Sequence, residues 1–143
     1  MRDAISAPRS GSPLLGAVRV GAAVVLALHG IVHWIGFAVP FGLMTTESIT
    51  FTTKALWGGF DLGDGGAKVL AVAYLALIVP FVVAAYGILR RKTWAIPLTA
   101  VTAWLSAVVC ALGSPNAVVG LVLDLVIVAL VLLAARLTAV RSA

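Results

Sequence analysis

Two histidines, His29 and His33, lie four residues apart in the apolar stretch LHGIVHWIGF, residues 28–37. Residues at positions i and i+4 project from the same face of a helix, so both imidazoles can face one pocket. An imidazole in such a place can bind a metal, exchange protons near neutral pH or form hydrogen bonds between helices. The chemistry therefore depends on which other polar side chains reach the same place.

One carboxylate, that of Asp124, lies within the apolar stretch GLVLDLVIVAL. A carboxylate that faces lipid costs about 2.5–3.5 kcal/mol on insertion scales, so such a residue normally faces the interior of a bundle. It lowers this cost by binding a proton or by pairing with a donor. Asp124 is therefore predicted either to be a neutral, hydrogen-bonded packing residue or to handle a ligand or a proton.

A metal or haem site is the weaker interpretation of the histidines. Zinc or copper needs a third or fourth donor, so the weak metal candidates are His29, His33 and Asp124. One haem cannot take both histidines, because its axial ligands lie on opposite faces of the ring, and the chain has no third histidine. Cys110 is the only cysteine, which excludes a thiolate zinc cluster. No cofactor is predicted, and hydrogen bonds that fix helix packing are the structural alternative.

Four apolar segments must position these side chains. The chain has 143 residues, of which 62% are hydrophobic and 10% charged, unlike a soluble domain. The apolar residues gather at 20–39, 67–89, 94–112 and 117–135. The length of each segment is close to the ~20 residues that a helix needs to cross a hydrocarbon core of ~30 Å. The predicted fold is all-α, a single domain of residues 1–143 with four transmembrane helices; a cleaved signal sequence is the alternative for the first segment.

Depth along the helices brings one polar side chain from each to a similar level. At a rise of ~1.5 Å per residue, His33 and Asp124 lie roughly 9–10 Å below the outer ends of their helices, as do Tyr74 and Ser106 below theirs. His29 lies deeper. We therefore expect a polar layer in which His33, ahead of His29, faces Asp124, with Tyr74 and Ser106 nearby.

Basic residues flank the four segments on one side of the predicted membrane. They precede the first helix, connect the second to the third, and follow the fourth: Arg2, Arg9, Arg19, Arg90, Arg91, Lys92, Arg136 and Arg141. By the positive-inside rule, both termini face the cytoplasm. Topology and lipid headgroups then explain the net charge of +5, so nucleic acid is not a predicted partner.

The outer side carries one long connection, residues 41–66, rich in aromatic residues and glycine. Asp64 is predicted to cap the second helix, because a carboxylate can accept hydrogen bonds from the free amides of a first turn. A cation or substrate mouth formed with Asp61 is the alternative, although two acids lack the ligand spacing of a calcium loop.

Helix three carries a series of small residues at helical spacing, Ala103, Ala107 and Ala111, beside a stripe formed by Thr99, Ser106 and Cys110. Small residues let helices in lipid approach closely, so this face could pack within the monomer or form a homodimer interface. We expect the monomer interior, because the polar stripe beside the alanines prefers protein to lipid. The oligomeric state is left open.

The order of LHGIVHWIGFAVPFGL, ALWGGFDLGDGGAKV and three further spans resembles small uncharacterised bacterial four-helix integral membrane proteins, and loosely the DoxX-like proteins. The resemblance implies a bacterial cytoplasmic (inner) membrane and a bundle that holds a hydrophobic ligand, without an established activity. The predicted function is to bind a lipid- or quinone-like molecule or to serve as an accessory membrane subunit. The alternative is a small membrane enzyme or a proton-coupled carrier that uses the His/Asp site, so enzymatic activity is left open.

Overall fold

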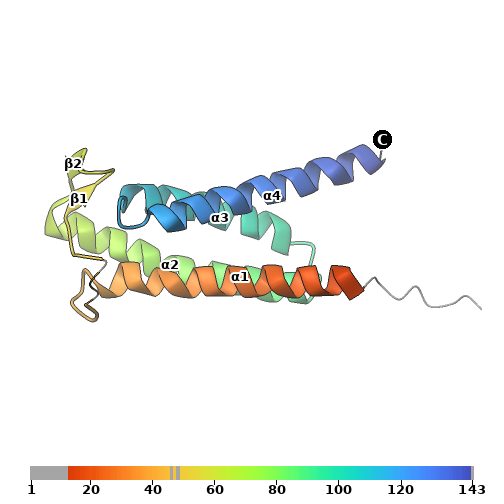
Figure 1. Ribbon diagram of the computed structural model, residues 1–143, viewed down its shortest axis with the longest axis horizontal. Coiled ribbons are helices and arrows are strands. Elements are labelled where there is room, and N and C mark those ends of the chain that lie inside the picture. Colours follow the sequence, from red (N-terminus) through yellow and green to blue (C-terminus); the bar gives the residue numbers. More distant parts are fainter. Residues whose placement is uncertain (1–12, 46, 48, 143) are drawn as a thin grey trace, which may run out of the picture.

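The computed structural model describes residues 13–142 except 46 and 48, and it describes side chains as far as residue 136. It contains helices α1 (Pro13–Ala38), α2 (Gly63–Leu89), α3 (Ala95–Leu112) and α4 (Val118–Ser142), with a short hairpin of strands β1 (Lys54–Ala55) and β2 (Phe60–Asp61) (Figure 1). All four helices are long and apolar enough to cross a membrane. The predicted all-α fold with four transmembrane helices is therefore confirmed.

Three of the four helices extend beyond the apolar segments from which they were predicted, whereas α3 lies within its segment, 94–112. α1 begins at Pro13 rather than at residue 20, α2 at Gly63 rather than at residue 67, and α4 continues to Ser142 rather than ending at residue 135. Hydropathy marks only the part of a helix that suits hydrocarbon, whereas the helix can continue where water or headgroups surround it. Proline is also well suited to a first helical position, because its missing N–H has no partner there in any case.

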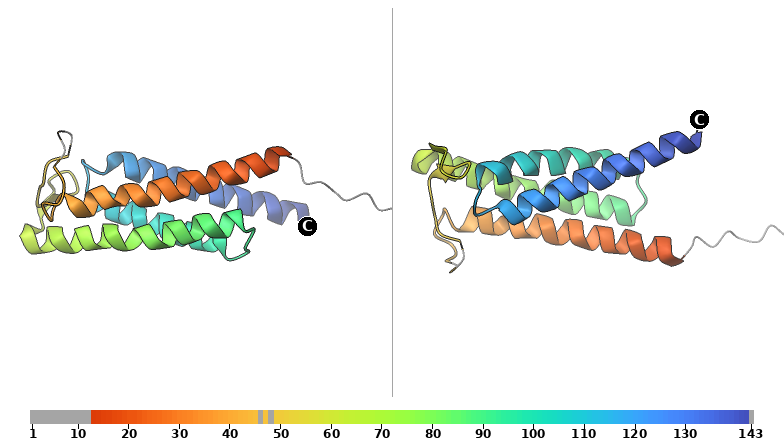
Figure 2. Two further views of the ribbon diagram at one scale, coloured as in Figure 1. Left: turned by 90° about the horizontal axis from the view of Figure 1, so that it is seen from below. Right: turned by 45° about the horizontal axis from the view of Figure 1, so that its top comes forward.

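The helices pack in the order of the sequence, α1 along α2, α2 along α3 and α3 along α4, whereas α1 and α4 approach each other less closely. The second half of α4 leans away from α1 in each view (Figures 1 and 2). The core joins all four helices through Ala23, Leu26, Leu77, Phe81, Ala85, Ala103, Ile127 and Val128. Ala103 and Ala107 are buried, so this face of α3 packs inside the monomer as predicted.

The start of α1, the turn between α2 and α3, and the end of α4 lie at one end of the bundle (Figure 1). Arg19, Arg91 and Lys92 line one groove at this end. The described basic residues of the helix ends therefore gather on one side, as the sequence predicts. Arg2 and Arg9 lie outside the described residues, and so does the side chain of Arg141.

The hairpin in the long connection between α1 and α2 docks on the loop between α3 and α4. Lys54 pairs with Asp61 and Ala55 with Phe60. Leu56 and Trp57 turn the chain with φ angles of 47° and 55°. Their amides donate hydrogen bonds of 3.2 and 2.9 Å to the carbonyls of Leu112 and Ser114. The connection therefore covers one end of the bundle.

The prediction that Asp64 caps α2 is wrong. α2 begins at Gly63, one residue before Asp64, and Leu62 occupies the cap position without a side-chain hydrogen bond. The acid that contacts the start of the helix is Asp61, whose Oδ1 accepts a 2.9 Å hydrogen bond from the amide of Gly63. Gly63 makes this early entry possible because its φ of 64° suits glycine best.

Candidate functional site

Both carboxylate oxygens of Asp124 in α4 are hydrogen-bonded to side chains of other helices. Oδ1 lies 2.7 Å from Nε2 of His29 in α1, and Oδ2 lies 2.6 Å from the hydroxyl of Ser106 in α3. Asp124 and Ser106 are 0% exposed and His29 is 6% exposed. The buried carboxyl group therefore has a partner on each side, which lowers the cost of its burial.

His33 extends this arrangement by one step. Its Nδ1 donates a 2.9 Å hydrogen bond to the backbone carbonyl of His29, and its Nε2 lies 2.8 Å from Oγ of Ser106. Because a carbonyl oxygen only accepts, Nδ1 carries a hydrogen. His29, Asp124, Ser106 and His33 thus form one continuous chain of hydrogen bonds from three helices, which we call the polar network.

The geometry limits where protons can lie in the polar network. The gaps between Asp124 and Ser106 (2.6 Å) and between Ser106 and His33 (2.8 Å) each need one proton. Ser106 supplies one of them. The other belongs either to Asp124, with every group neutral, or to His33, which is then an imidazolium opposite a carboxylate. These two arrangements differ only in the positions of the two protons.

The structure reverses the predicted order of the histidines. His29, not His33, bonds directly to Asp124, and His33 reaches the carboxylate through Ser106. The depth count assumed parallel helices that end at one level, whereas α1 and α4 run at an angle to each other (Figure 2). Ser106 joins the polar network, whereas Tyr74 lies beside it. The Tyr74 hydroxyl donates a 3.2 Å hydrogen bond to the Val109 carbonyl, and its ring centroid is 5.6 Å from that of His33.

Phe81 of α2 is a site residue that the sequence reasoning missed. It is 0% exposed, and its ring centroid lies 4.9 Å from that of His29 and 5.5 Å from that of His33. The two imidazoles also meet edge to face at 4.9 Å. Phe81 therefore holds both rings in place by packing. The available signal was its position next to Pro80, which lies at a depth similar to that of His29.

The three weak metal candidates are engaged with each other or with Ser106. Among the residues that the structure describes, no three His, Cys, Asp or Glu side chains converge as ligands of one ion. His29 is hydrogen-bonded to Asp124, and His33 is hydrogen-bonded to the His29 carbonyl and to Ser106. The arrangement is a hydrogen-bonded site.

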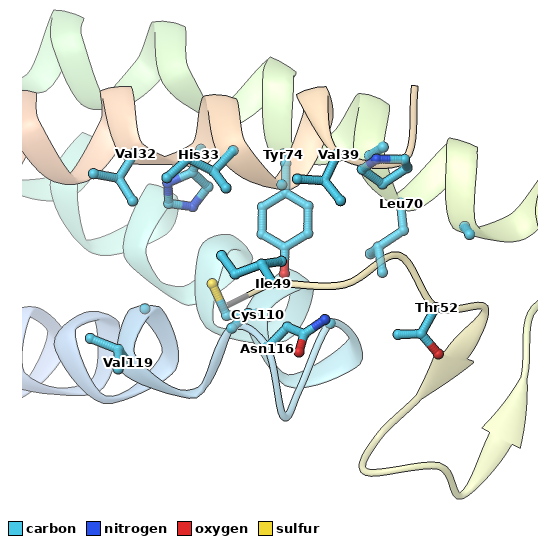
Figure 3. A pocket seen from close by; sticks show the side chains of 18 of the residues that line it. Val32, His33, Val39, Ile49, Thr52, Leu70, Tyr74, Cys110, Asn116 and Val119 are labelled. Carbon is cyan, nitrogen blue, oxygen red and sulfur yellow. The ribbon is translucent and has the colours of Figure 1, made fainter. Parts of the chain in front are cut away.

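A cavity of about 670 Å³ lies beside the polar network, between α1, α2 and the first half of α4 (Figure 3). Most of its wall is apolar, and both His29 and His33 line it, whereas Ser106 and Asp124 do not. Tyr74 and Cys110 contribute to the wall near its centre (Figure 3).

The cavity is covered at the end of the bundle that carries the hairpin, and it opens between α1 and α4. Residues 49–52 of the long connection lie over it, fixed by a 3.0 Å hydrogen bond from the Asn116 side chain to the Thr50 carbonyl. The wall residues Leu28, Val32 and Val119 are 58%, 57% and 79% exposed. Because these three belong to α1 and to the first half of α4, the opening lies between these two helices.

Comparison with known proteins identifies no family or relative. No protein-family model, no curated protein and no solved structure matches the chain.

Proposed function

We propose that this membrane protein binds a lipid- or quinone-like molecule in the cavity, with the polar head group at His29 and His33. The observation that carries the proposal is a cavity of about 670 Å³ with an apolar wall and both imidazoles on its surface. Binding sites for small molecules have volumes of about 300–1,000 Å³, mostly apolar walls and a few placed polar groups. The polar network fixes the orientation of the imidazoles behind the cavity surface.

The proposed setting is a bacterial cytoplasmic membrane with both termini inside the cell. The groove formed by Arg19, Arg91 and Lys92 supports this orientation, because basic residues are retained on the cytoplasmic side. The resemblance to small bacterial four-helix membrane proteins supports the location. In this orientation the ligand enters from the outer half of the bilayer, between α1 and α4.

A substitution that fills the cavity tests the proposal. Gly120 lines the cavity, and a Cβ atom there would lie 3.0 Å from Sγ of Cys110. The matched control is Gly21 in α1, where an added Cβ meets nothing within 4 Å. Protein purified with minimal detergent is extracted, and the bound molecules are quantified by mass spectrometry.

We expect a hydrophobic molecule in stoichiometric amount with the wild type and with Gly21→Leu, and little with Gly120→Leu. Equal occupancy in all three proteins would show that the molecule binds outside the cavity. A wild type without any stoichiometric hydrophobic molecule, tested also after incubation with long-chain quinones and phospholipids, would contradict the proposal.

A second function, a membrane enzyme or proton-coupled carrier, is favoured by one observation. The polar network can hold a proton on either Asp124 or His33, which suits proton exchange with a substrate. Protein reconstituted in vesicles that contain a pH-sensitive dye tests this function. Proton movement or turnover of an added lipid that is lost in Asp124→Asn, while binding persists, would favour it over binding alone.

A further inference from the structure

His29 has one ring nitrogen without a protein partner. Its Nε2 is bonded to Asp124, and no residue in the described part of the chain bonds its Nδ1. His33, by contrast, uses both nitrogens. The Tyr74 hydroxyl is also engaged, with the Val109 carbonyl. A head group that reaches the imidazoles from the cavity therefore meets one available ring nitrogen, Nδ1 of His29.

Proton counting shows that this nitrogen is an acceptor. When the polar network is electroneutral, His29, Asp124 and His33 together hold three hydrogens on their titratable atoms. One lies on Nδ1 of His33, one between His29 and Asp124, and one joins the Ser106 hydrogen in the two gaps beside Ser106. None remains for Nδ1 of His29. Neutrality is the favoured state because an uncompensated buried charge is expensive.

We infer, on the basis of the proposed function, that the cavity ligand is a neutral lipid whose head group carries a hydroxyl donor, and that Nδ1 of His29 accepts its hydrogen bond. Long-chain phenols, hydroquinones and alcohols belong to this class. A head group with acceptors alone, such as an ether or an ester, leaves Nδ1 of His29 unpaired opposite another lone pair. The site therefore selects for ligands with a hydroxyl group. A ligand without one leaves a buried polar group of the protein unpaired, and this cost strongly disfavours its binding.

A matched pair of ligands tests this inference. The probes are para-dodecylphenol and its methyl ether. The two molecules have similar shapes, but only the phenol has a hydroxyl group that can donate a hydrogen bond. Binding is measured by competition between the two probes on the detergent-solubilised protein, with the bound fraction read by mass spectrometry. We expect wild type to prefer the phenol by about tenfold, the effect of one buried hydrogen bond.

A substitution of His29 shows whether Nδ1 is the acceptor. The glutamine of His29→Gln keeps an N–H donor for Asp124 but places no acceptor at the position of Nδ1, so the preference should disappear. The control is Thr99→Val, which removes a buried hydroxyl bonded only to its own helix, at 2.8 Å from the Ala95 carbonyl. This control should keep the preference of the wild type.

Nitrogen NMR of the histidines gives a second readout, which does not depend on the variants. The chain has only 2 histidines, so ¹⁵N-histidine labelling yields two imidazole spectra. We expect Nδ1 of His29 to lack a hydrogen in the free protein, and its resonance to move when the phenol binds but not when the ether binds.

The outcomes separate this inference from the proposed function. If both probes bind the cavity equally well, the inference is wrong and the proposed function stands. If neither probe nor any other hydrophobic molecule binds, the proposed function fails. A protonated Nδ1 of His29 in the free protein, or a preference for the phenol that persists in His29→Gln, would also overturn the inference.

Discussion

Nε2 of His29 and Oδ1 of Asp124, 95 positions apart in the chain, lie 2.7 Å apart and join α1 to α4. These two helices pack against each other less closely than helices that are neighbours in the sequence. The hydrogen bond therefore connects the bundle where its apolar packing is weakest. The same place borders the cavity, so one contact both closes the bundle and orients an imidazole toward the proposed ligand.

Asparagine at position 124 is expected to preserve the fold, whereas leucine is not. In Asp124→Asn the amide oxygen accepts from His29 and the amide N–H donates to Ser106, as in the neutral arrangement of the polar network. We expect its free energy of unfolding to stay within about 0.5 kcal/mol of the wild type. Asp124→Leu leaves Nε2 of His29 unpaired and should lower the free energy of unfolding by about 1–2 kcal/mol.

Unfolding in mixed micelles, followed by circular dichroism, measures both variants of Asp124. An equal loss of stability in Asp124→Asn and Asp124→Leu would show that the carboxylate is charged and paired with a protonated His33.

Close packing of α1 on α2 depends on Gly30. A Cβ atom at this position would lie 2.6 Å from Cβ of Phe81, closer than side chains tolerate. Gly30→Ala should therefore move the helices apart and lower the free energy of unfolding by about 1–3 kcal/mol. The control Gly21→Ala adds the same atom to the same helix in open space, and it should raise stability by about 0.5–1 kcal/mol. Equal effects at the two positions would contradict this account of the packing.

The hairpin of β1 and β2 is expected to loosen in acid because of Asp61. Interactions with the Thr53 hydroxyl, then with the Gly63 amide and Lys54, hold the pKa of Asp61 below its ordinary value of 3.8. The stabilisation by this carboxylate is thus complete above pH 3.8 and is lost as the pH falls through the lowered pKa. Hydrogen exchange at the Leu62 and Gly63 amides measures the opening. Asp61→Asn should remove this pH dependence, and an unchanged acid response in that variant would assign it to another group.

Topology is tested by cysteine labelling in a Cys110→Ala background. A membrane-impermeant maleimide added to intact cells should label Lys54→Cys, which lies in the hairpin, and should not label Arg91→Cys. After the membrane is opened, Arg91→Cys should react as well, because the basic turn faces the cytoplasm in the proposed orientation. The reverse pattern would invert the orientation.

The sequence was sufficient to predict the helices and the members of the polar network, for a physical reason. A bilayer demands long apolar helices, and a carboxylate such as Asp124 within one must find a partner inside the bundle. Counting the rise per residue then brought Ser106, Asp124 and His33 to a similar level, with His29 deeper. The count could not show that His29, rather than His33, reaches Asp124, because the levels at which the helices end and the angles between them depend on tertiary packing.

The hairpin and the cavity could not be predicted for a different reason. The turn at Leu56 and Trp57 takes positive φ angles, which are unusual for such residues and have no sequence signal. Hydrogen bonds to the carbonyls of Leu112 and Ser114, which are distant in sequence, accompany this conformation. The cavity likewise lies between helices that are distant in sequence, and no local pattern encodes their relative placement.

The opening between α1 and α4 also determines the concentration scale on which the cavity fills. A molecule that enters between these helices stays in the bilayer throughout, so its reference phase is lipid rather than water. Occupancy of the cavity then follows the mole fraction of the molecule among the surrounding lipids. Dilution with inert lipid should therefore empty the cavity, in the same way that dilution with buffer empties a binding site on a soluble protein. The protein would thus respond to the composition of the membrane, independently of the aqueous volume around it.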